Sequence, residues 1–453
     1  MGDPARVRGK LVEPRILRVE RGGVPLYWAE SAPPVRAGLA FRVGRADEAL
    51  ASAGVTRLVG QLALGGAGGE GQFDVGPTVS AFRVTGSPAT ATRFLRAVTD
   101  AVSTLPSKEA VAEARRKMPA AAPVGVAELA LGLRWGGRGP GLARHEEYGL
   151  TWLGLDEVSA WREAWFTTGN AVAWLCGPRL DAVDLALPDG ARQPVAPLPP
   201  ARTPTPAVVR LAVGAAAVSI VHRPSPELTA ALDDLGAERL ALTGEVEHAL
   251  LSAPNVDELL RRLDAAPHQR LAPPARLSEP PGPGDLWRWC CGELFATRVT
   301  SRPEQAMART WSSETSLGAA FGEALESALF LVDDEATLPG DVADGGGRWS
   351  AVPNEGVTHL PTTIDRAQPT KRLIVEATAI TLVLDQQRAV RIALAGATSL
   401  RFADGGRGLW SAEGLYLDVH PADWERGEAA IAAIDRTIPA SRTVPLVSAR
   451  PRG

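Results

Sequence analysis

The chain has 453 residues, of which 45% are hydrophobic and 22% are charged. This length predicts roughly two to four domains, at about 150 residues each, with enough apolar side chains to form their cores. The 48 basic and 52 acidic side chains give a net charge of −4. This balance argues against a protein that mainly binds nucleic acid, because phosphate binding needs a basic surface.

The sequence also argues against membrane insertion and secretion. It contains no run of 18 uncharged apolar residues that could span a bilayer, and its first residues carry charges where a signal peptide would be apolar. Cys176, Cys290 and Cys291 form no C-x-x-C unit, and adjacent cysteines rarely bridge. We therefore expect reduced thiols and a cytoplasmic location.

Residues 1–185 predict an α+β lobe. The Gly22-Gly23 pair is typical of a hairpin turn, and the apolar spacing of Val55, Leu58, Val59 and Leu62 is helical. The lobe should hold a mostly antiparallel sheet with its helices packed on one face. The expected strands are 16–19, 24–28, 38–43, 73–75, 79–84 and 171–175, and the expected helices are 52–64, 88–105, 107–118, 124–135 and one from about 155.

Three further regions follow this lobe. Residues 186–206 are rich in proline and predict an extended linker. Residues 207–350 predict a second α/β lobe, with strands at 208–213, 218–222 and 330–332 and helices at 226–240, 255–264, 284–295 and 314–329. Residues 351–453 predict a small β-barrel-like domain that a helix at 423–437 closes; its expected strands are 372–376, 379–384, 389–394, 398–402, 407–411 and 414–419.

Two segments of the first lobe carry a family pattern. Residues 22–64 contain a strand pair, an F-x-x-G-x-x-x-E turn from Phe41 to Glu48, and a helix; residues 155–177 contain a helix followed by the strand motif FTTGNAV and Gly177. Both segments resemble the insulinase/pitrilysin family of zinc peptidases (M16). The resemblance implies two insulinase-like lobes, the second one degenerate.

The catalytic positions of that family are altered here. Its zinc motif, H-x-x-E-H, places two histidine ligands on one helical face with a glutamate as general base. The resemblance places Arg57, Gly60 and Gln61 at these three positions. Arginine is a permanent cation with only donors, glutamine is a poor zinc ligand, and glycine cannot take a proton.

The third ligand is missing as well. In the family it is a glutamate seven residues after another glutamate; Glu113 is the match to the first, and Ala120 lies at the ligand position. The six histidines are scattered, and we read the His145-Glu146-Glu147 run as surface charge. Phosphate-loop, nucleophile-elbow and dinucleotide motifs are also absent. We therefore expect no catalytic residues, no metal and no cofactor.

These observations predict a non-catalytic pseudopeptidase. In active relatives an Arg/Tyr pair of the second lobe grips the substrate backbone. This chain has three tyrosines, and all of them lie outside its second lobe: Tyr27, Tyr148 and Tyr416. Because the family forms clamshells of four α/β units, the resemblance implies that this two-lobed chain pairs with a zinc-bearing paralogue in a peptide-processing heterodimer. The alternative is a homodimeric scaffold, or a peptide- or small-molecule-binding protein, without a protease partner. A third reading, an enzyme with a relocated site, lacks a catalytic group.

The C-terminal region resembles pleckstrin-homology-like modules. The resemblance rests on its strand ladder, the turns at 404–410 and 413–414, and the amphipathic closing helix. Such modules bind lipids, peptides or proteins. Here the basic side chains are offset by acidic ones, which favours protein docking or a structural role over phosphoinositide binding.

Overall fold

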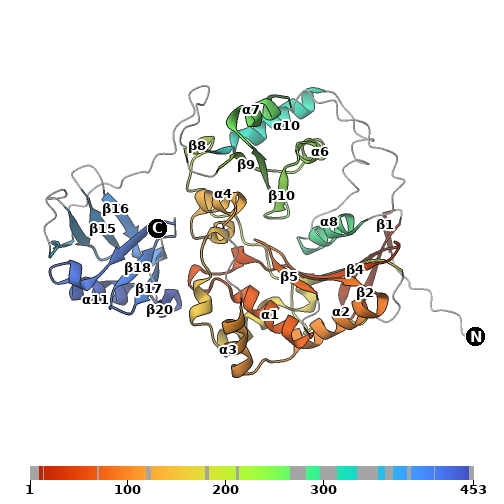
Figure 1. The fold of residues 1–453 in the computed structure, drawn as a ribbon, viewed down its shortest axis with the longest axis horizontal. Coiled ribbons are helices and arrows are strands. Elements are labelled where there is room, and N and C mark those ends of the chain that lie inside the picture. The colour runs from red at the N-terminus through yellow and green to blue at the C-terminus, as the bar shows by residue number, and fades with distance from the viewer. Residues whose placement is uncertain are drawn as a thin grey trace, which may run out of the picture.

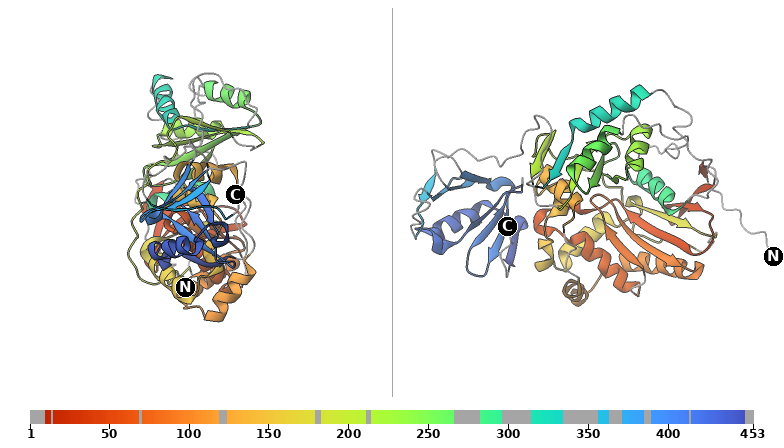
Figure 2. Two further views of the ribbon diagram at one scale, coloured as in Figure 1. Left: turned by 90° about the vertical axis from the view of Figure 1, so that its left-hand side faces the viewer. Right: turned by 45° about the horizontal axis from the view of Figure 1, so that its top comes forward.

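The structure is a computed structural model that describes residues 10–13, 15–68, 71–118, 124–178, 183–210, 214–265, 282–295, 314–333, 356–362, 371–384, 389–412 and 414–447. Two α/β lobes pack against each other, and the C-terminal region, called the tail below (residues 356–447), lies beside the first lobe (Figure 1). Two further views show the same arrangement (Figure 2). No helix within the described ranges is long and apolar enough to cross a bilayer.

The two lobe sheets share one topology. In each, the five core strands are ordered first–fifth–second–fourth–third, and only the first and fifth strands are parallel. The first lobe adds a hairpin at one edge and follows the order β1 (Lys10–Glu13), β2 (Ile16–Arg21), β3 (Val24–Ala29), β7 (Ala171–Cys176), β4 (Val35–Phe41), β6 (Ser80–Gly86), β5 (Gln72–Val75). The second lobe follows β10 (Glu238–Ala241), β11 (Glu247–Ala253), β9 (Ala216–His222), β12 (Leu329–Val332), β8 (Ala207–Arg210). The predicted α+β class with two related lobes is thus confirmed.

Helices with one apolar face cover each sheet. Leu58, Phe94 and Leu95 are buried against Phe41 and Phe82 of the first sheet. The helices of this layer are α1 (Val55–Gly66), α2 (Pro88–Ser103), α3 (Lys108–Lys117) and α5 (Leu155–Trp165). The second sheet is covered in the same way by α6 (Pro226–Asp234), α7 (Val256–Ala265) and α10 (Glu314–Glu326).

The opposite face of each sheet is covered by a helix from the other lobe, which the expectation of helices on one face did not include. Helix α4 (Val126–Trp135) of the first lobe places Ala130 against Ala217, Leu250 and Leu331 of the second sheet. Helix α8 (Pro283–Leu294) of the second lobe places residues Leu286, Trp289, Cys290 and Leu294 on the first sheet, against Tyr27, Val172 and Trp174. The lobes therefore share their cores.

The linker is docked on the first lobe. Leu185, just before it, and Leu187, at its start, belong to the first-lobe core. Farther along, the backbone N–H of Arg202 donates to the carbonyl of Arg134 (2.6 Å), and the Thr203 hydroxyl donates to the carbonyl of Leu133 (2.7 Å). Residues 186–206 form neither helix nor strand, and these contacts hold them against the first lobe.

Strand β10 of the second lobe replaces the end of a predicted helix, and neither β10 nor its partner β11 was predicted. Helix α6 ends at Asp234, and Gly236 adopts φ +71°, a left-handed conformation that terminates helices. The chain then enters β10, which pairs with β11. The predicted helix over 226–240 was therefore too long, because the glycine signal was not used.

The tail contains two four-stranded sheets and a helix. The strands of the first sheet are ordered β13 (Val357–His359), β14 (Arg372–Val375), β15 (Ala379–Val383), β16 (Ala389–Ala393). The strands of the second sheet are ordered β19 (Tyr416–Val419), β18 (Arg407–Trp410), β17 (Thr398–Phe402), β20 (Thr443–Val447). Helix α11 (Gly427–Thr437) packs Ile431 and Ile434 into a core with Ile380 and Leu409. Within the described residues the sheets do not close into a barrel, and β13 and β20 were not predicted.

Candidate functional site

The residues that the resemblance assigns to the family's catalytic positions begin on α1. Its inward side chains Val55, Leu58 and Val59 are buried in the first-lobe core. Arg57 and Gln61 lie one turn apart on the same helix and are partly buried. The helix start is held by Glu48 of the F-x-x-G-x-x-x-E turn, whose carboxylate accepts the backbone N–H groups of Gly54 (2.8 Å) and Thr56 (2.9 Å).

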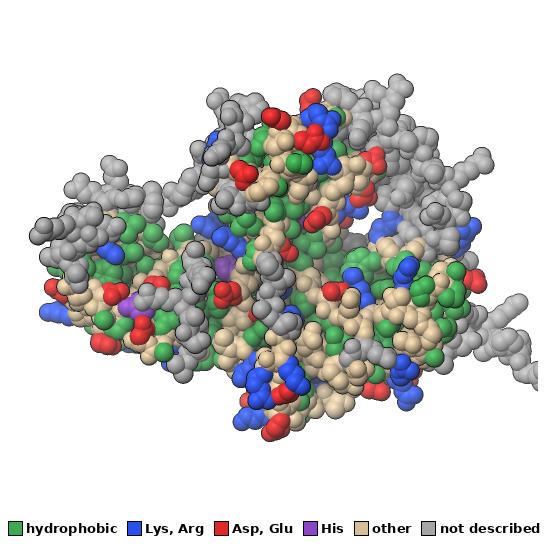
Figure 3. Space-filling view, in the orientation of Figure 1, with side chains coloured by type: hydrophobic (Ala, Val, Ile, Leu, Met, Phe, Trp, Pro, Cys, Tyr) green, Lys and Arg blue, Asp and Glu red, His purple; other side chains and the backbone are tan. Residues whose placement is uncertain are grey.

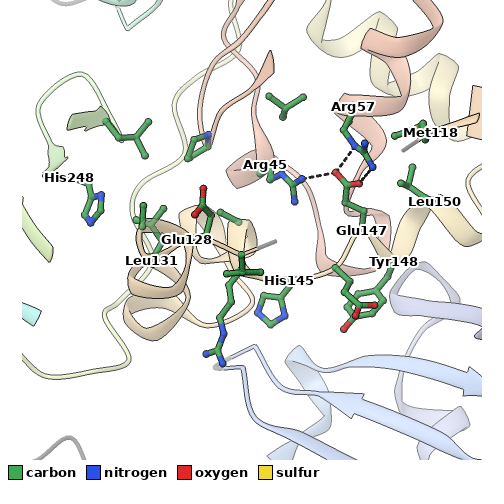
Figure 4. A pocket seen from close by; sticks show the side chains of 18 of the residues that line it. Arg45, Arg57, Met118, Glu128, Leu131, His145, Glu147, Tyr148, Leu150 and His248 are labelled. Atoms are coloured by element: carbon green, nitrogen blue, oxygen red, sulfur yellow. Dashed lines mark hydrogen bonds and ion pairs between the residues drawn. The ribbon is translucent and has the colours of Figure 1, made fainter. Parts of the chain in front are cut away.

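Arg57 forms a buried ion pair. Its Nε donates to Oε1 of Glu147 at 2.9 Å, and its Nη2 also contacts this carboxylate. Arg45 donates to the same carboxylate at 2.6 Å. The Glu147 side chain is only 3% exposed, whereas Arg57 and Arg45 are 15% and 19% exposed. One carboxylate thus holds two guanidinium groups (Figure 4). Arg57, which the resemblance assigns to the first ligand position, is a cation that would repel a metal ion.

The space beside Gly60 is filled. A Cβ atom built on Gly60 would lie 1.9 Å from Cε1 of Phe73, far closer than non-bonded carbon atoms approach each other. Phe73 comes from β5 and packs on Phe82 with a 4.3 Å centroid separation. Position 60, to which the resemblance assigns the family's general base, therefore lacks room for any side chain in this packing.

The third ligand position lies outside the described residues. Ala120 is not placed, and Glu113 lies on the surface of α3, where it pairs with Lys117 (2.9 Å) and Arg116. Among the residues that the structure describes, no three His, Cys, Asp or Glu side chains gather as a metal-binding group.

A cavity of about 890 Å³ lies between the lobes beside this ion pair. Its first-lobe wall includes Arg45, Arg57 and Glu147, and its second-lobe wall includes Leu240 and His248 (Figure 4). The cavity is lined by both apolar and charged side chains. Its remaining lining residues are Val75, Pro77, Arg115, Met118, Val124, Ala127, Glu128, Leu131, Ala143, Arg144, His145, Glu146, Tyr148, Leu150, Thr151, Glu238, Arg239 and Leu250. The cavity could hold a short peptide segment or a small molecule.

The histidines of the cavity are neutral. Burial lowers the pKa of His248 to about 3 and that of His145 to about 4. His248 Nε2 lies 2.9 Å from the Ser219 hydroxyl, a spacing that nucleophile–base pairs also show. Ser219 is fully buried, however, and its oxygen accepts a hydrogen bond from Arg134 at 2.8 Å. This pair therefore belongs to the lobe interface.

Sequence reasoning missed the central group of the site. Glu147 was interpreted as surface charge, and the structure shows that this was wrong: its side chain is buried between two arginines. Glu147 and Arg57 are 90 residues apart, and no local pattern pairs them.

The exposed charges outside the site are mixed, because basic and acidic side chains are interspersed on the face that Figure 3 shows.

No protein-family model matches the sequence, and no curated protein matches it. Solved structures do. The periplasmic protease PqqL from Escherichia coli matches with a TM-score of 0.53 at 11% identity, over 85% of this chain and 56% of PqqL. Pitrilysin matches with a TM-score of 0.52 at 11% identity, over 73% of this chain and 46% of pitrilysin. An inactive peptidase M16 domain from Pseudomonas fluorescens has a TM-score of 0.49 at 14% identity, over 72% of this chain and 99% of that domain.

The likenesses to PqqL and pitrilysin establish the insulinase-like fold. They do not extend to activity, because 11% identity carries no information on the chemistry of a site. The chain spans about half the length of these two peptidases.

A testable consequence concerns Glu48. Burial raises its pKa from the ordinary value to about 7, against the lowering effect of the Gly54 and Thr56 amides. The folded state therefore binds the Glu48 proton more tightly than the unfolded state does. The resulting stabilisation is complete below about pH 4.5 and is lost as the pH rises through about 7.

Glu48→Gln, which is neutral at every pH, isolates this effect. We expect the difference in unfolding free energy, wild type minus variant, to fall by roughly 3 kcal/mol between pH 4.5 and pH 8. Denaturant unfolding of both proteins across this range measures it. A difference that stays constant with pH would show that Glu48 keeps an ordinary pKa.

Proposed function

We propose that this protein is a non-catalytic insulinase-like pseudopeptidase. The observation that carries the proposal is the Arg57–Glu147–Arg45 ion pair, because the resemblance assigns Arg57 to the first zinc-ligand position. The Phe73 ring beside Gly60 supports it, because the ring occupies the space that a general base would need. In this proposal the cavity binds a peptide without cleaving it.

The chain pairs, in this proposal, with a zinc-bearing paralogue of similar length in a peptide-processing heterodimer. The support is the match to two peptidases, which covers only 56% of PqqL and 46% of pitrilysin. The alternative is a homodimeric scaffold, which the mixed lining of the 890 Å³ cavity also suits. The domain limits, the pleckstrin-homology-like identity of the tail and the cytoplasmic location stay predictions; PqqL is described as periplasmic.

We expect the purified chain to contain no stoichiometric zinc and to cleave no peptide. Elemental analysis and a mixed peptide library analysed by mass spectrometry test both points. One zinc per chain together with chelator-sensitive cleavage would overturn the proposal.

Purification of the native complex separates the two assemblies. A co-purifying protein of similar length with an intact H-x-x-E-H motif would favour the heterodimer. Recovery of two copies of this chain alone would favour the scaffold. Native mass spectrometry of the purified complex distinguishes these outcomes.

A further inference from the structure

The loop that carries Glu147 contacts the tail as well as the cavity. We call residues 136–153 the Glu147 loop. On its tail side, Leu142 and Tyr148 share a buried apolar cluster with Leu400, Phe402 and Val444 of the tail. Leu50 and Ala51 of the first lobe complete this cluster. The first lobe and the tail are thus joined by an apolar contact with a closed interior.

The contact continues along the loop. The backbone N–H of Gly137 donates to the carbonyl of Ala412 at 2.9 Å. The His145 ring packs edge-on against Trp410 of the tail, with centroids 5.0 Å apart. A Cβ atom built on Gly414 would lie 3.2 Å from Cα of Gly136, so the two backbones are in close contact there. The tail therefore touches the loop at several points between Gly136 and Tyr148.

Neighbouring residues of the loop face opposite sides. His145 and Tyr148 point toward the tail strands, whereas Glu147 points toward Arg45 and Arg57 (Figure 4). Tyr148 is 4% exposed, so it cannot shift without opening the apolar cluster. Because Glu147 directly precedes Tyr148, a shift of the backbone at either residue displaces the other.

The loop is also packed closely against the start of α1. The backbone N–H of Gly149 donates to the carbonyl of Ala53 at 3.0 Å. A Cβ atom on Gly54, which adopts φ +99°, would lie 2.8 Å from Cβ of Glu147. Such packing does not deform continuously, so the loop is either seated or released as a unit.

We propose that the tail clamps the Glu147 loop and thereby holds the Arg57–Glu147–Arg45 ion pair closed at the wall of the cavity. Displacement of the tail then releases Glu147 and loosens that wall. The coupling is reciprocal, because loss of the ion pair must weaken the tail contact by the same free energy. This inference requires neither the absence of zinc nor a partner chain.

Two leucines on adjacent tail strands give a matched test. Leu400 on β17 and Leu409 on β18 are both fully buried, but Leu400 faces the first lobe and Leu409 faces the tail core. We expect Leu400→Ala in the full chain to accelerate amide exchange over residues 145–151 at least tenfold. Leu409→Ala should change it less than twofold. Equal acceleration by both variants, or by neither, would overturn the clamp.

Glu147→Gln tests whether the tail acts through the ion pair. If it does, Leu400→Ala should add less than twofold to the exchange rate in the Glu147→Gln background, because the loop is already released. An undiminished tenfold effect would show that the tail merely shields the loop. Should Leu400→Ala fail to fold, Val444→Ala and its tail-core control Val419→Ala remove less volume, and the expected contrast is at least threefold.

Discussion

Gly60→Ala should destabilise the protein by about 3 kcal/mol, although alanine is the better helix former. The added Cβ would lie 1.9 Å from Cε1 and 2.0 Å from Cδ1 of Phe73. Phe73 is 9% exposed and packs on Phe82, so its ring has little space into which to move. Overpacking of a filled core is therefore expected to outweigh the gain in helix propensity.

Two controls separate these terms. In a Phe73→Ala background the space is open, and Gly60→Ala should then stabilise the variant by up to about 1 kcal/mol. Gly65→Ala in the same helix should also stabilise, because a Cβ there meets no atom within 4 Å. Denaturant unfolding of the variants measures each change. A neutral Gly60→Ala in the wild-type background would contradict the steric argument.

The same contact bears on restoring the zinc motif. Arg57→His, Gly60→Glu and Gln61→His together should yield no peptide turnover, since the glutamate must displace Phe73 and the third ligand position carries Ala120. The histidine at position 57 would also leave Glu147 buried with Arg45 as its remaining cation. Loss of stability is the expected result, before any gain of metal binding.

The sequence predicted local features well and long-range contacts poorly. The helix α1 and the strands β4 and β7 follow from apolar periodicity, which is a property of neighbouring residues. The resemblance then assigned Arg57 and Gly60 to catalytic positions of the family. It could not supply Glu147 or Phe73, because the partner of a side chain across the fold leaves no periodic signal. The packing of α4 and α8 on the sheet of the opposite lobe was not predicted, for the same reason.

Arg134→Ala should cost about 4 kcal/mol and uncouple the two lobes. Arg134 lies on α4, is 3% exposed, and reaches across into the second lobe. There it donates to the hydroxyl of Ser219 (2.8 Å), the carbonyl of Ser219 (2.5 Å) and the carbonyl of Ser327 (2.6 Å). Burial lowers the pKa of Arg134 to about 10, so it remains charged at neutral pH. Its removal leaves the two carbonyls buried without this donor.

Two further variants identify the source of this loss. Arg134→Met retains most of the volume and removes the cost of burying a cation, so we expect roughly half the effect of alanine. Arg96→Ala on the exposed face of α2, where the side chain is 77% exposed, should change stability by less than about 0.5 kcal/mol. Denaturant unfolding gives the free energies, and a second transition in Arg134→Ala would report separate unfolding of the lobes. A loss within about 1 kcal/mol, with one transition, would mean that the apolar contacts of α4 and α8 suffice to join them.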